Sequence, residues 1–281
     1  MVIVQMEGGL GNQMFQYALY LNCKARGVNA KLDVSKYDSE FSHNGYELEK
    51  IFSINEKYCS AGEKLIIKPL SKLLHLLVNH SYKEKKEWQW KYQQDVASIK
   101  FGFIKGYWQS EKYFITIAET LRDKFKFPPM QDIVNKKLLD KINQVNSVSL
   151  HIRRGDYLLG QNAASLGIGY YERSIVFINE KLNQPHYFIF SDDIEWAKQN
   201  IQVTNGEFID WNTGSKSFVD MQLMSECKHN IIANSSFSWW GAWLNSNSTK
   251  IVISPAQWMP HMEGTADAIP ENWIQLPANF Q

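Results

Sequence analysis

An apolar run ends in four polar or charged side chains in the segment VSLHIRRGDY, residues 148–157: His151, Arg153, Arg154 and Asp156. Side chains alternate between the two faces of a strand, so His151 and Arg153 share the face opposite to the apolar residues. The planar guanidinium of arginine matches phosphate oxygens two at a time and stays charged at any working pH. The segment therefore predicts an anion site, suited to a diphosphate, at the carboxyl end of a strand.

A structural interpretation of the same arginines is also open. On an edge strand, Arg153 and Arg154 would pair with Asp156 and with neighbouring carboxylates. Burial works against this interpretation, because moving a guanidinium out of water costs several kcal/mol unless an anion accompanies it. We favour the anion site.

Two carboxylates, Asp192 and Asp193, follow the apolar run HYFIFS directly. Asp192 with Glu195 fits a capping box at the start of a short helix. Alternatively, the Asp192 carboxylate accepts two parallel hydrogen bonds from the ring N–H and the exocyclic amine of guanine, a paired edge that adenine lacks. Both interpretations stay open.

The segment Asn234-Ser235-Ser236 ends another strand-like run and opens the helix-like stretch FSWWGAWLN. Backbone N–H groups and hydroxyls at a helix start form a neutral cradle for phosphate, and plain N-capping explains only one of the three residues. The tryptophans of that stretch are expected to pack in the core, with Gly241 allowing a close approach.

A glycine-rich turn, GGLGNQ, opens the first helix-like stretch. Met14 stands where a dinucleotide fingerprint needs its third glycine, and G-K-[ST] does not occur, so the dinucleotide and P-loop motifs are excluded. The turn, with Gly11, instead presents the amides of Asn12 and Gln13 to sugar hydroxyls or phosphate.

Strand-like and helix-like segments alternate along the chain. Residues 2–6, 12–26 and 29–33 form one strand–helix–strand unit, whereas 34–145 give no firm topology. The second half predicts strands at 148–153, 187–191, 207–210, 230–233 and 251–254, with helices at 170–182, 194–200, 217–227 and 237–245. Such alternation indicates an α/β fold with parallel sheets, whose ligands lie beyond the carboxyl ends of the strands.

The bulk composition excludes several function classes. Thirty Lys+Arg against 29 Asp+Glu give a net charge of +1, so no global field attracts nucleic acid. Three separated cysteines show no C-x-x-C pair, and no apolar run reaches the ~18 residues of a membrane span. We expect a cytoplasmic protein without a nucleic-acid partner.

Residues 64–91 carry seven lysines against two glutamates, next to a helical repeat of apolar residues that includes Leu70 and Leu73. A basic amphipathic segment of this kind would make a weak peripheral contact with an anionic membrane surface, here the inner membrane. The interpretation we favour is a solvated helix whose apolar residues pack on the core.

Five segments in combination resemble the bacterial α-1,2-fucosyltransferases of glycosyltransferase family 11: GGLGNQMFQYA, KGYWQSEKYF, HIRRGDY, SDD and ANSSFSWWGAWLN. The combination is highly specific, whereas among the single segments only HIRRGDY is. The resemblance implies a GT-B-like α/β fold, in which two Rossmann-like halves with parallel sheets face a cleft. It places an acceptor-side half at 1–146, a GDP-sugar-binding half at 147–256 and a tail at 257–281 that packs back on the cleft region.

The resemblance also implies a reaction. L-Fucose would pass with inversion from GDP-β-L-fucose to the 2-hydroxyl of a terminal β-galactoside, in a bacterial surface glycan of O-antigen or capsule type. Arg153 would bind the β-phosphate and, with Asp156, forms the candidate catalytic pair. The donor-binding residues implied by the resemblance are Gly11, Asn12, Gln13, His151, Arg153, Arg154, Asp192, Asn234, Ser235 and Ser236.

No metal or other cofactor is expected, because the chain lacks a D-x-D motif and arginine and backbone dipoles would stabilise the leaving diphosphate. The catalytic base stays open among Asp156, Asp33, Glu7 and Glu111. Asp156 suits a structural role better, since its own arginines would lower its basicity.

Two other functions stay open at this point. A non-catalytic glycan- or nucleotide-binding module would stack sugars on the aromatic segments near 88–92 and 101–108. Another GDP-sugar transferase of the same architecture would bind the same nucleotide. The acceptor glycan and the oligomeric state have no decodable signal in the sequence.

Overall fold

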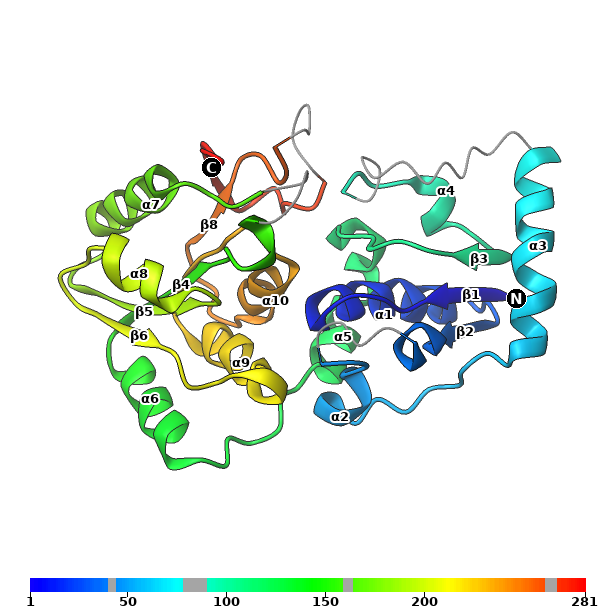
Figure 1. The fold of residues 1–281 in the computed structure, drawn as a ribbon, viewed down its shortest axis with the longest axis horizontal. Coiled ribbons are helices and arrows are strands. Elements are labelled where there is room, and N and C mark those ends of the chain that lie inside the picture. Colours follow the sequence, from blue (N-terminus) through cyan, green and yellow to red (C-terminus); the bar gives the residue numbers. More distant parts are fainter. Residues whose placement is uncertain (40–43, 78–89, 159–163, 261–266) are drawn as a thin grey trace. The chain divides into compact units, whose positions relative to one another are not determined.

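The computed structural model describes residues 1–39, 44–77, 90–158, 164–260 and 267–281, and of residues 74–77 only the backbone. The chain divides into two compact units, Met1–Pro128 and Pro129–Gln281 (Figure 1). Each unit combines a parallel sheet with helices, which confirms the expected α/β class.

The sheet of the first unit has the order β2-β1-β3 and is parallel throughout. Strand β1 (Val2–Gln5) leads through helix α1 (Leu10–Ala25) to β2 (Ala30–Asp33), which is the predicted strand–helix–strand unit, and β3 is Gly102–Ile104. Gly8 has a φ of +79°, and a Cβ there would lie 2.8 Å from Nδ2 of Asn12. The turn into α1 therefore requires glycine.

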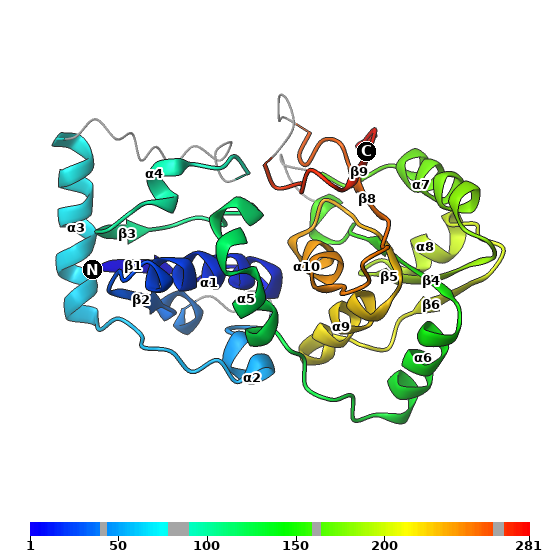
Figure 2. The ribbon, with the colours of Figure 1, turned by 180° about the vertical axis from the view of Figure 1, so that it is seen from behind.

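The remaining elements of the first unit lie in the stretch whose topology could not be predicted from the sequence (Figure 2). They are η1 (Ser35–Asp38), α2 (Leu48–Phe52), α3 (Ala61–Leu77), α4 (Gln94–Ala97), η3 (Glu111–Tyr113), η4 (Ile115–Ile117) and α5 (Ala118–Lys124). A capping box starts α3: the N–H of Ser60 donates to Glu63 at 2.9 Å, and the N–H of Glu63 donates to Oγ of Ser60 at 3.2 Å.

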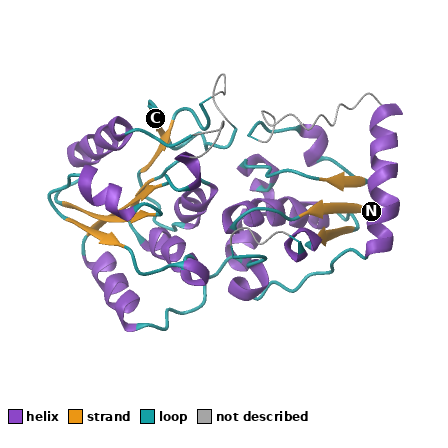
Figure 3. Ribbon diagram, in the orientation of Figure 1, coloured by secondary structure: helices purple, strands orange, loops and turns teal. Residues whose placement is uncertain are grey.

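The second unit has a larger parallel sheet of order β6-β5-β4-β7-β8-β9 (Figure 3). Its strands are β4 (Asn146–Ile152), β5 (Pro185–Ser191), β6 (Gly206–Ile209), β7 (His229–Ile231), β8 (Val252–Pro255) and β9 (Ile274–Leu276). Because β4 pairs with both β5 and β7, it is a central strand. The edge-strand interpretation of its arginines is therefore wrong.

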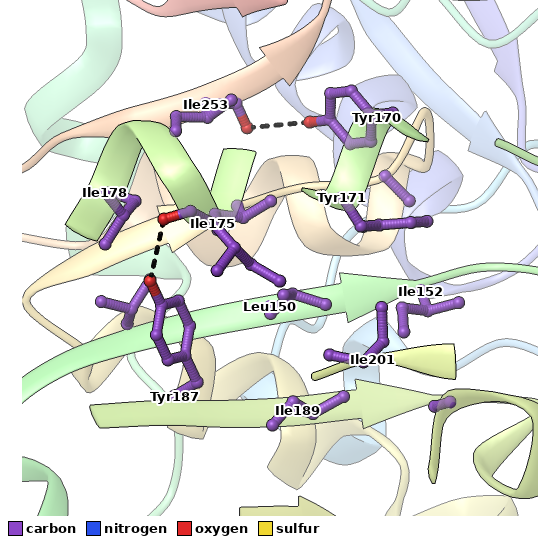
Figure 4. Packing of buried hydrophobic residues seen from close by; sticks show 14 of the residues in the cluster. Leu150, Ile152, Tyr170, Tyr171, Ile175, Ile178, Tyr187, Ile189, Ile201 and Ile253 are labelled. Carbon is purple, nitrogen blue, oxygen red and sulfur yellow. Dashed lines mark hydrogen bonds between the residues drawn. The ribbon is translucent and has the colours of Figure 1, made fainter. Parts of the chain in front are cut away.

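Helices cover both faces of this sheet. They are α6 (Ile133–Gln144), α7 (Ile168–Lys181), α8 (Ile194–Asn200), α9 (Phe218–Glu226) and α10 (Ser236–Leu244), with η5 (Asp156–Leu158) and η6 (Gly214–Lys216). Figure 4 shows one face, where Leu150 and Ile189 pack beside Tyr171 and Ile175 of α7. On the other face, Phe188 belongs to a cluster with residues of α6 and α9.

The observed boundary between the units lies 18 residues before the expected one at 146/147. Helix α6 belongs to the second unit because Leu138 and Ile142 pack in the cluster beneath β5. The described residues of the expected tail, 257–260 and 267–281, also belong to that unit, since β9 extends its sheet beside β8. The sequence did not predict this strand.

Helix α10 packs closely in the core of the second unit. Trp239, Trp240 and Trp243 are buried, at 0%, 0% and 4% exposure, which confirms their expected core role. A Cβ on Gly241 would lie 2.9 Å from Cβ of Met224 in α9. The close approach of α9 and α10 thus depends on glycine at this position.

We expect Gly241→Ala to lower the free energy of unfolding by about 1–3 kcal/mol, because the added methyl group must push two packed helices apart. Urea denaturation measures the change. Gly62→Ala is the matched control: it also lies in a helix, but its nearest neighbour would be 3.9 Å away. An equal loss in both variants would contradict the packing argument.

Candidate functional site

Arg153 follows the carboxyl end of β4, where its guanidinium contacts two carboxylates. Nη2 lies 2.8 Å from Oδ1 of Asp156, and Nη1 lies 3.2 Å from Oδ2 of Asp192. The arginine side chain is 27% exposed and Asp156 is 55% exposed. The predicted pairing with carboxylates therefore exists, yet one edge of the guanidinium still reaches the surface.

Arg154 is buried, and its contacts hold the second unit together. Its Nε donates to Asp193 at 3.1 Å, its Nη1 donates to Gln281 at 2.7 Å, and its guanidinium lies 3.9 Å from the ring centre of Trp196. These contacts join the end of β4 to α8 and to the C-terminal segment. The geometry gives Arg154 a structural role at the site.

Of the two functions that the sequence offered for Asp192, helix capping belongs to Asp193 instead. The helix cap is Asp193, whose carboxylate accepts the N–H of Trp196 at 3.2 Å. Asp192 accepts the backbone N–H of Arg154 at 2.8 Å and pairs with Arg153 through its other oxygen. The capping-box interpretation of Asp192 with Glu195 is therefore wrong, and Asp192 joins the endings of β4 and β5.

His151 lies on the face of β4 that α10 covers, with its ring centre 5.8 Å from that of Phe237. It is 6% exposed, and its Nδ1 has no hydrogen-bond partner among the described residues. Burial, and to a lesser degree the charge of Arg153, lowers the pKa of His151 to about 3. The ring is therefore neutral at physiological pH.

The loop before α10 lies next to these groups. The amide of Asn234 donates to the carbonyls of Ala164 and Trp258, each at 3.0 Å, and Ser235 caps α10 by accepting the N–H of Phe237 at 3.3 Å. Ser236, the first residue of α10, is half-buried. As the sequence suggested, N-capping accounts for Ser235 alone.

Tyr157 connects the two parts of the site, a role that the sequence did not reveal. Its hydroxyl donates to the carbonyl of Asn234 at 3.2 Å, and the guanidinium carbon of Arg153 lies 5.6 Å from its ring centre. Through Tyr157 and the contact of His151 with Phe237, the end of β4 meets the start of α10. An arginine, a neutral histidine and a helix N-terminus thus adjoin one another.

The glycine turn belongs to the first unit. Gln13 is fully buried, and its Nε2 donates to the carbonyls of Gly8 and Gly45 at 3.0 and 2.8 Å, while its Oε1 accepts the N–H of Glu47. Asn12 is half-buried and accepts a bond from Gln109 at 2.8 Å. Gln13 therefore braces the turn that contains Gly11, and Asn12 is the more accessible amide.

Two of the three candidate bases of the first unit, Glu7 and Asp33, lie near the carboxyl ends of its strands and pair with lysines. Glu7 pairs with Lys36 at 2.8 Å, and Asp33, whose side chain is 2% exposed, pairs with Lys64 at 2.6 Å. Burial raises the pKa of Asp33, but its bonds to Lys64 and Ser35 outweigh burial, so the net pKa is lowered. Glu111 is half-buried in η3. Asp156, with its side chain 55% exposed, is thus the most exposed of the four candidate bases.

Comparison with known proteins identifies the family of the chain. The family model described as "Glycosyl transferase family 11" matches residues 1–277. The chain belongs to this family. It is 37% identical to an alpha-1,2-colitosyltransferase of Escherichia coli, with 98% of each chain covered. It is 32% identical to the O-antigen biosynthesis glycosyltransferase WbnK of Escherichia coli, over 96% of this chain and 99% of the relative.

More distant relatives of this family 11 protein include galactoside alpha-(1,2)-fucosyltransferase 1 of Homo sapiens, 22% identical over 66% of this chain and 56% of the relative. Among solved structures, the fucosyltransferase NodZ from Bradyrhizobium superposes with a TM-score of 0.52. The identity is 12%, with 85% of this chain and 91% of NodZ covered. This likeness concerns the fold, and it confirms the GT-B-like class.

We expect the stability of the protein to fall as the pH drops from about 6.5 toward 3, in part because of His151. In that window the unfolded chain binds a proton on this residue that the folded chain does not, so unfolding is favoured. His151→Gln removes the effect. Between pH 7 and pH 4, the difference in unfolding free energy between wild type and variant should change by about 3 kcal/mol. Urea denaturation at both pH values measures it, and a constant difference would contradict a buried neutral His151.

Proposed function

We propose that the protein transfers a fucose-type sugar from a GDP-linked donor to the 2-hydroxyl of a galactoside, in the synthesis of O-antigen. The observation that carries the proposal is Arg153, a half-exposed guanidinium beside a helix N-terminus at the carboxyl edge of a parallel sheet. Family membership favours a glycosyltransferase over a non-catalytic binding module.

The guanidinium of Arg153 keeps N–H donors that can bind a diphosphate. Of its five N–H donors, one on Nη1 faces Asp192 and one on Nη2 faces Asp156. Asp192 fixes the guanidinium plane from the buried side. Asp156 is more exposed, and we expect the donor phosphate to take its place, because two carboxylates beside one arginine leave a net negative charge that repels the diphosphate.

The N-terminus of α10 supplies the second part of the phosphate site. Its partial positive charge and the Ser236 hydroxyl would face the same phosphates as Arg153, since Tyr157 holds the two segments together. This combination would stabilise the negative charge of the departing GDP without a metal ion.

The nucleoside is expected to contact His151. Its neutral ring has a buried Nδ1 with which no described residue forms a hydrogen bond, and burying such an atom is costly unless a ligand satisfies it. Asp192 is a weaker candidate for guanine recognition than the sequence suggested, because both of its oxygens already contact the β4 ending. Each oxygen nevertheless keeps a second lone pair for a hydrogen bond.

In the proposed reaction, the acceptor 2-hydroxyl oxygen forms a bond to C1 of the sugar. The bond from C1 to the β-phosphate oxygen breaks, and its electron pair leaves with GDP. Attack from the face opposite to GDP converts the β-linked donor into an α-linked product. The hydroxyl proton passes to a carboxylate, for which Asp156 is exposed enough, or to water when C1–O cleavage runs ahead of attack.

The donor sugar has two candidates. GDP-L-fucose is the donor implied by the sequence motifs, and GDP-L-colitose is favoured by the relative that is 37% identical. Colitose is L-fucose without its 3-hydroxyl group. A site that hydrogen-bonds this hydroxyl rejects the sugar that lacks it, whereas an apolar site discriminates weakly.

We expect Arg153→Lys to reduce kcat/KM for the GDP-sugar by roughly 100- to 1000-fold while the protein stays folded, because lysine loses the planar fork. Arg154→Lys is the matched substitution one residue along the chain. It should mainly lower the melting temperature, since Arg154 joins three segments. Near-native transfer by Arg153→Lys would disprove the proposed site.

Incubation with GDP-L-fucose and GDP-L-colitose, each with a panel of β-galactosides, tests the proposed reaction. We expect one donor to be preferred and linkage NMR to show an α-1,2 bond. Calorimetry with GDP, ADP and UDP in the presence of a chelator should show binding of GDP alone. Products with another linkage, or no nucleotide binding, would overturn the proposal.

A further inference from the structure

Helix α3 presents an apolar stripe on its outer side. Leu65, Ile66, Leu70 and Leu73 are 76%, 65%, 41% and 52% exposed, and their spacing places them on one face of the helix. Pro69 is exposed on the same face. The expectation that Leu70 and Leu73 pack on the core is therefore wrong.

The inner side of α3 is anchored, so the stripe has a fixed orientation. Ile67 is buried against Ile3 and Phe103, and Oγ of Ser71 accepts the N–H of Phe103 at 3.1 Å. Lys64 forms its ion pair with the buried Asp33 from the same side of the helix. In Figures 1 and 2, α3 lies at the margin of the first unit, and no described element of that unit covers its outer side.

Positive charge flanks the stripe. Lys68 and Lys72 lie along one border of it, and neither forms an ion pair within the described part of the chain. The ammonium of Lys68 lies 5.3 Å from the ring centre of Phe103, so Lys72 is the more accessible cation. The acidic residue of the helix, Glu63, is engaged by Lys31 and by the N–H of Ser60. The outer side of α3 thus combines a large apolar surface with two bordering lysines that no carboxylate of the described residues neutralises.

We propose that α3 docks on an anionic lipid surface, with its axis in the membrane plane. The apolar stripe enters the boundary between head groups and acyl chains, and Lys68 and Lys72 contact lipid phosphates. A surface position fits the finding that no helix in the described residues is long and apolar enough to cross a bilayer. This inference does not depend on the proposed transferase activity.

Charge argues against a second copy of the chain as the occupant. A two-fold contact through α3 would bring the same patch of both copies together. Lys68 and Lys72 of one copy would then lie near their equivalents, and like charges in a contact of this kind are unfavourable. Lipid phosphates have the opposite charge and complement the lysines.

Co-sedimentation with phosphatidylglycerol–phosphatidylcholine vesicles tests the proposal, with pure phosphatidylcholine vesicles for comparison. The double variant Ile66→Ser/Leu73→Ser should bind the anionic vesicles roughly tenfold more weakly or worse. Ile133→Ser/Val134→Ser is the control, since these residues are 64% and 51% exposed on α6. Lys72→Glu should weaken binding at low salt. Equal binding of wild type and Ile66→Ser/Leu73→Ser, or no preference for anionic vesicles, would overturn the proposal.

A fluorophore sensitive to polarity distinguishes the lipid from other occupants. It is attached to Ile66→Cys in a Cys59→Ser background, because Cys23 and Cys227 are buried. The emission should shift to the blue only when anionic vesicles are added. A shifted emission without lipid would mean that this chain or a second copy covers the stripe, and sedimentation velocity separates those two cases. Transfer to a soluble acceptor should be unchanged in Ile66→Ser/Leu73→Ser, which keeps this test separate from that of the proposed function.

Discussion

The carboxylate of Asp192 is the contact on which the geometry of the site depends. One oxygen holds the backbone of Arg154 and the other holds the guanidinium of Arg153, so a single side chain fixes the endings of two adjacent strands. Gly155 makes room for it, because a Cβ there would lie 2.8 Å from the same carboxylate. The Arg153 guanidinium is thereby held in one orientation before an anion binds. A preorganised charge of this kind lowers the free-energy cost of reorganising the site during a reaction.

Much of this arrangement follows from the sequence. Alternating strand and helix patterns predicted the parallel sheets, and the strand endings predicted where polar groups would gather, since parallel strands end on the same edge. The hydrogen-bond partners of individual side chains could not be predicted as well from the sequence. Asp192 and Asp193 are chemically identical neighbours, and only the helix start shows that Asp193 is the cap. Likewise, Gln13 looks accessible in a glycine turn, but contacts with Gly45 and Glu47, far along the chain, bury it.

Features that depend on contacts distant in the sequence, such as strand β9 and the orientation of α3, were not predicted correctly. Strand β9 is three residues long, and it forms because β8 offers an unpaired edge rather than because its sequence demands it. In α3, the apolar period was recognised, but Leu70 and Leu73 were wrongly assigned to the inward face. A period fixes which residues share a face, whereas Ile67 and Ser71 decide which face turns inward. A donor difference as small as one hydroxyl leaves no spacing pattern, so sugar identity is the least predictable property of the site.

The side-chain amide of Asn234 connects the loop before α10 to two other segments of the second unit. Its two side-chain amide hydrogens are donated to carbonyls from two other loops, and its backbone carbonyl accepts the Tyr157 hydroxyl. Spontaneous hydrolysis of that amide to a carboxylate would exchange a nitrogen for an oxygen of nearly equal size. Two attractions would become repulsions between oxygens, in a place where water cannot screen them. Deamidation of this one side chain would therefore weaken the contacts that hold the loop before α10, with almost no change in side-chain volume.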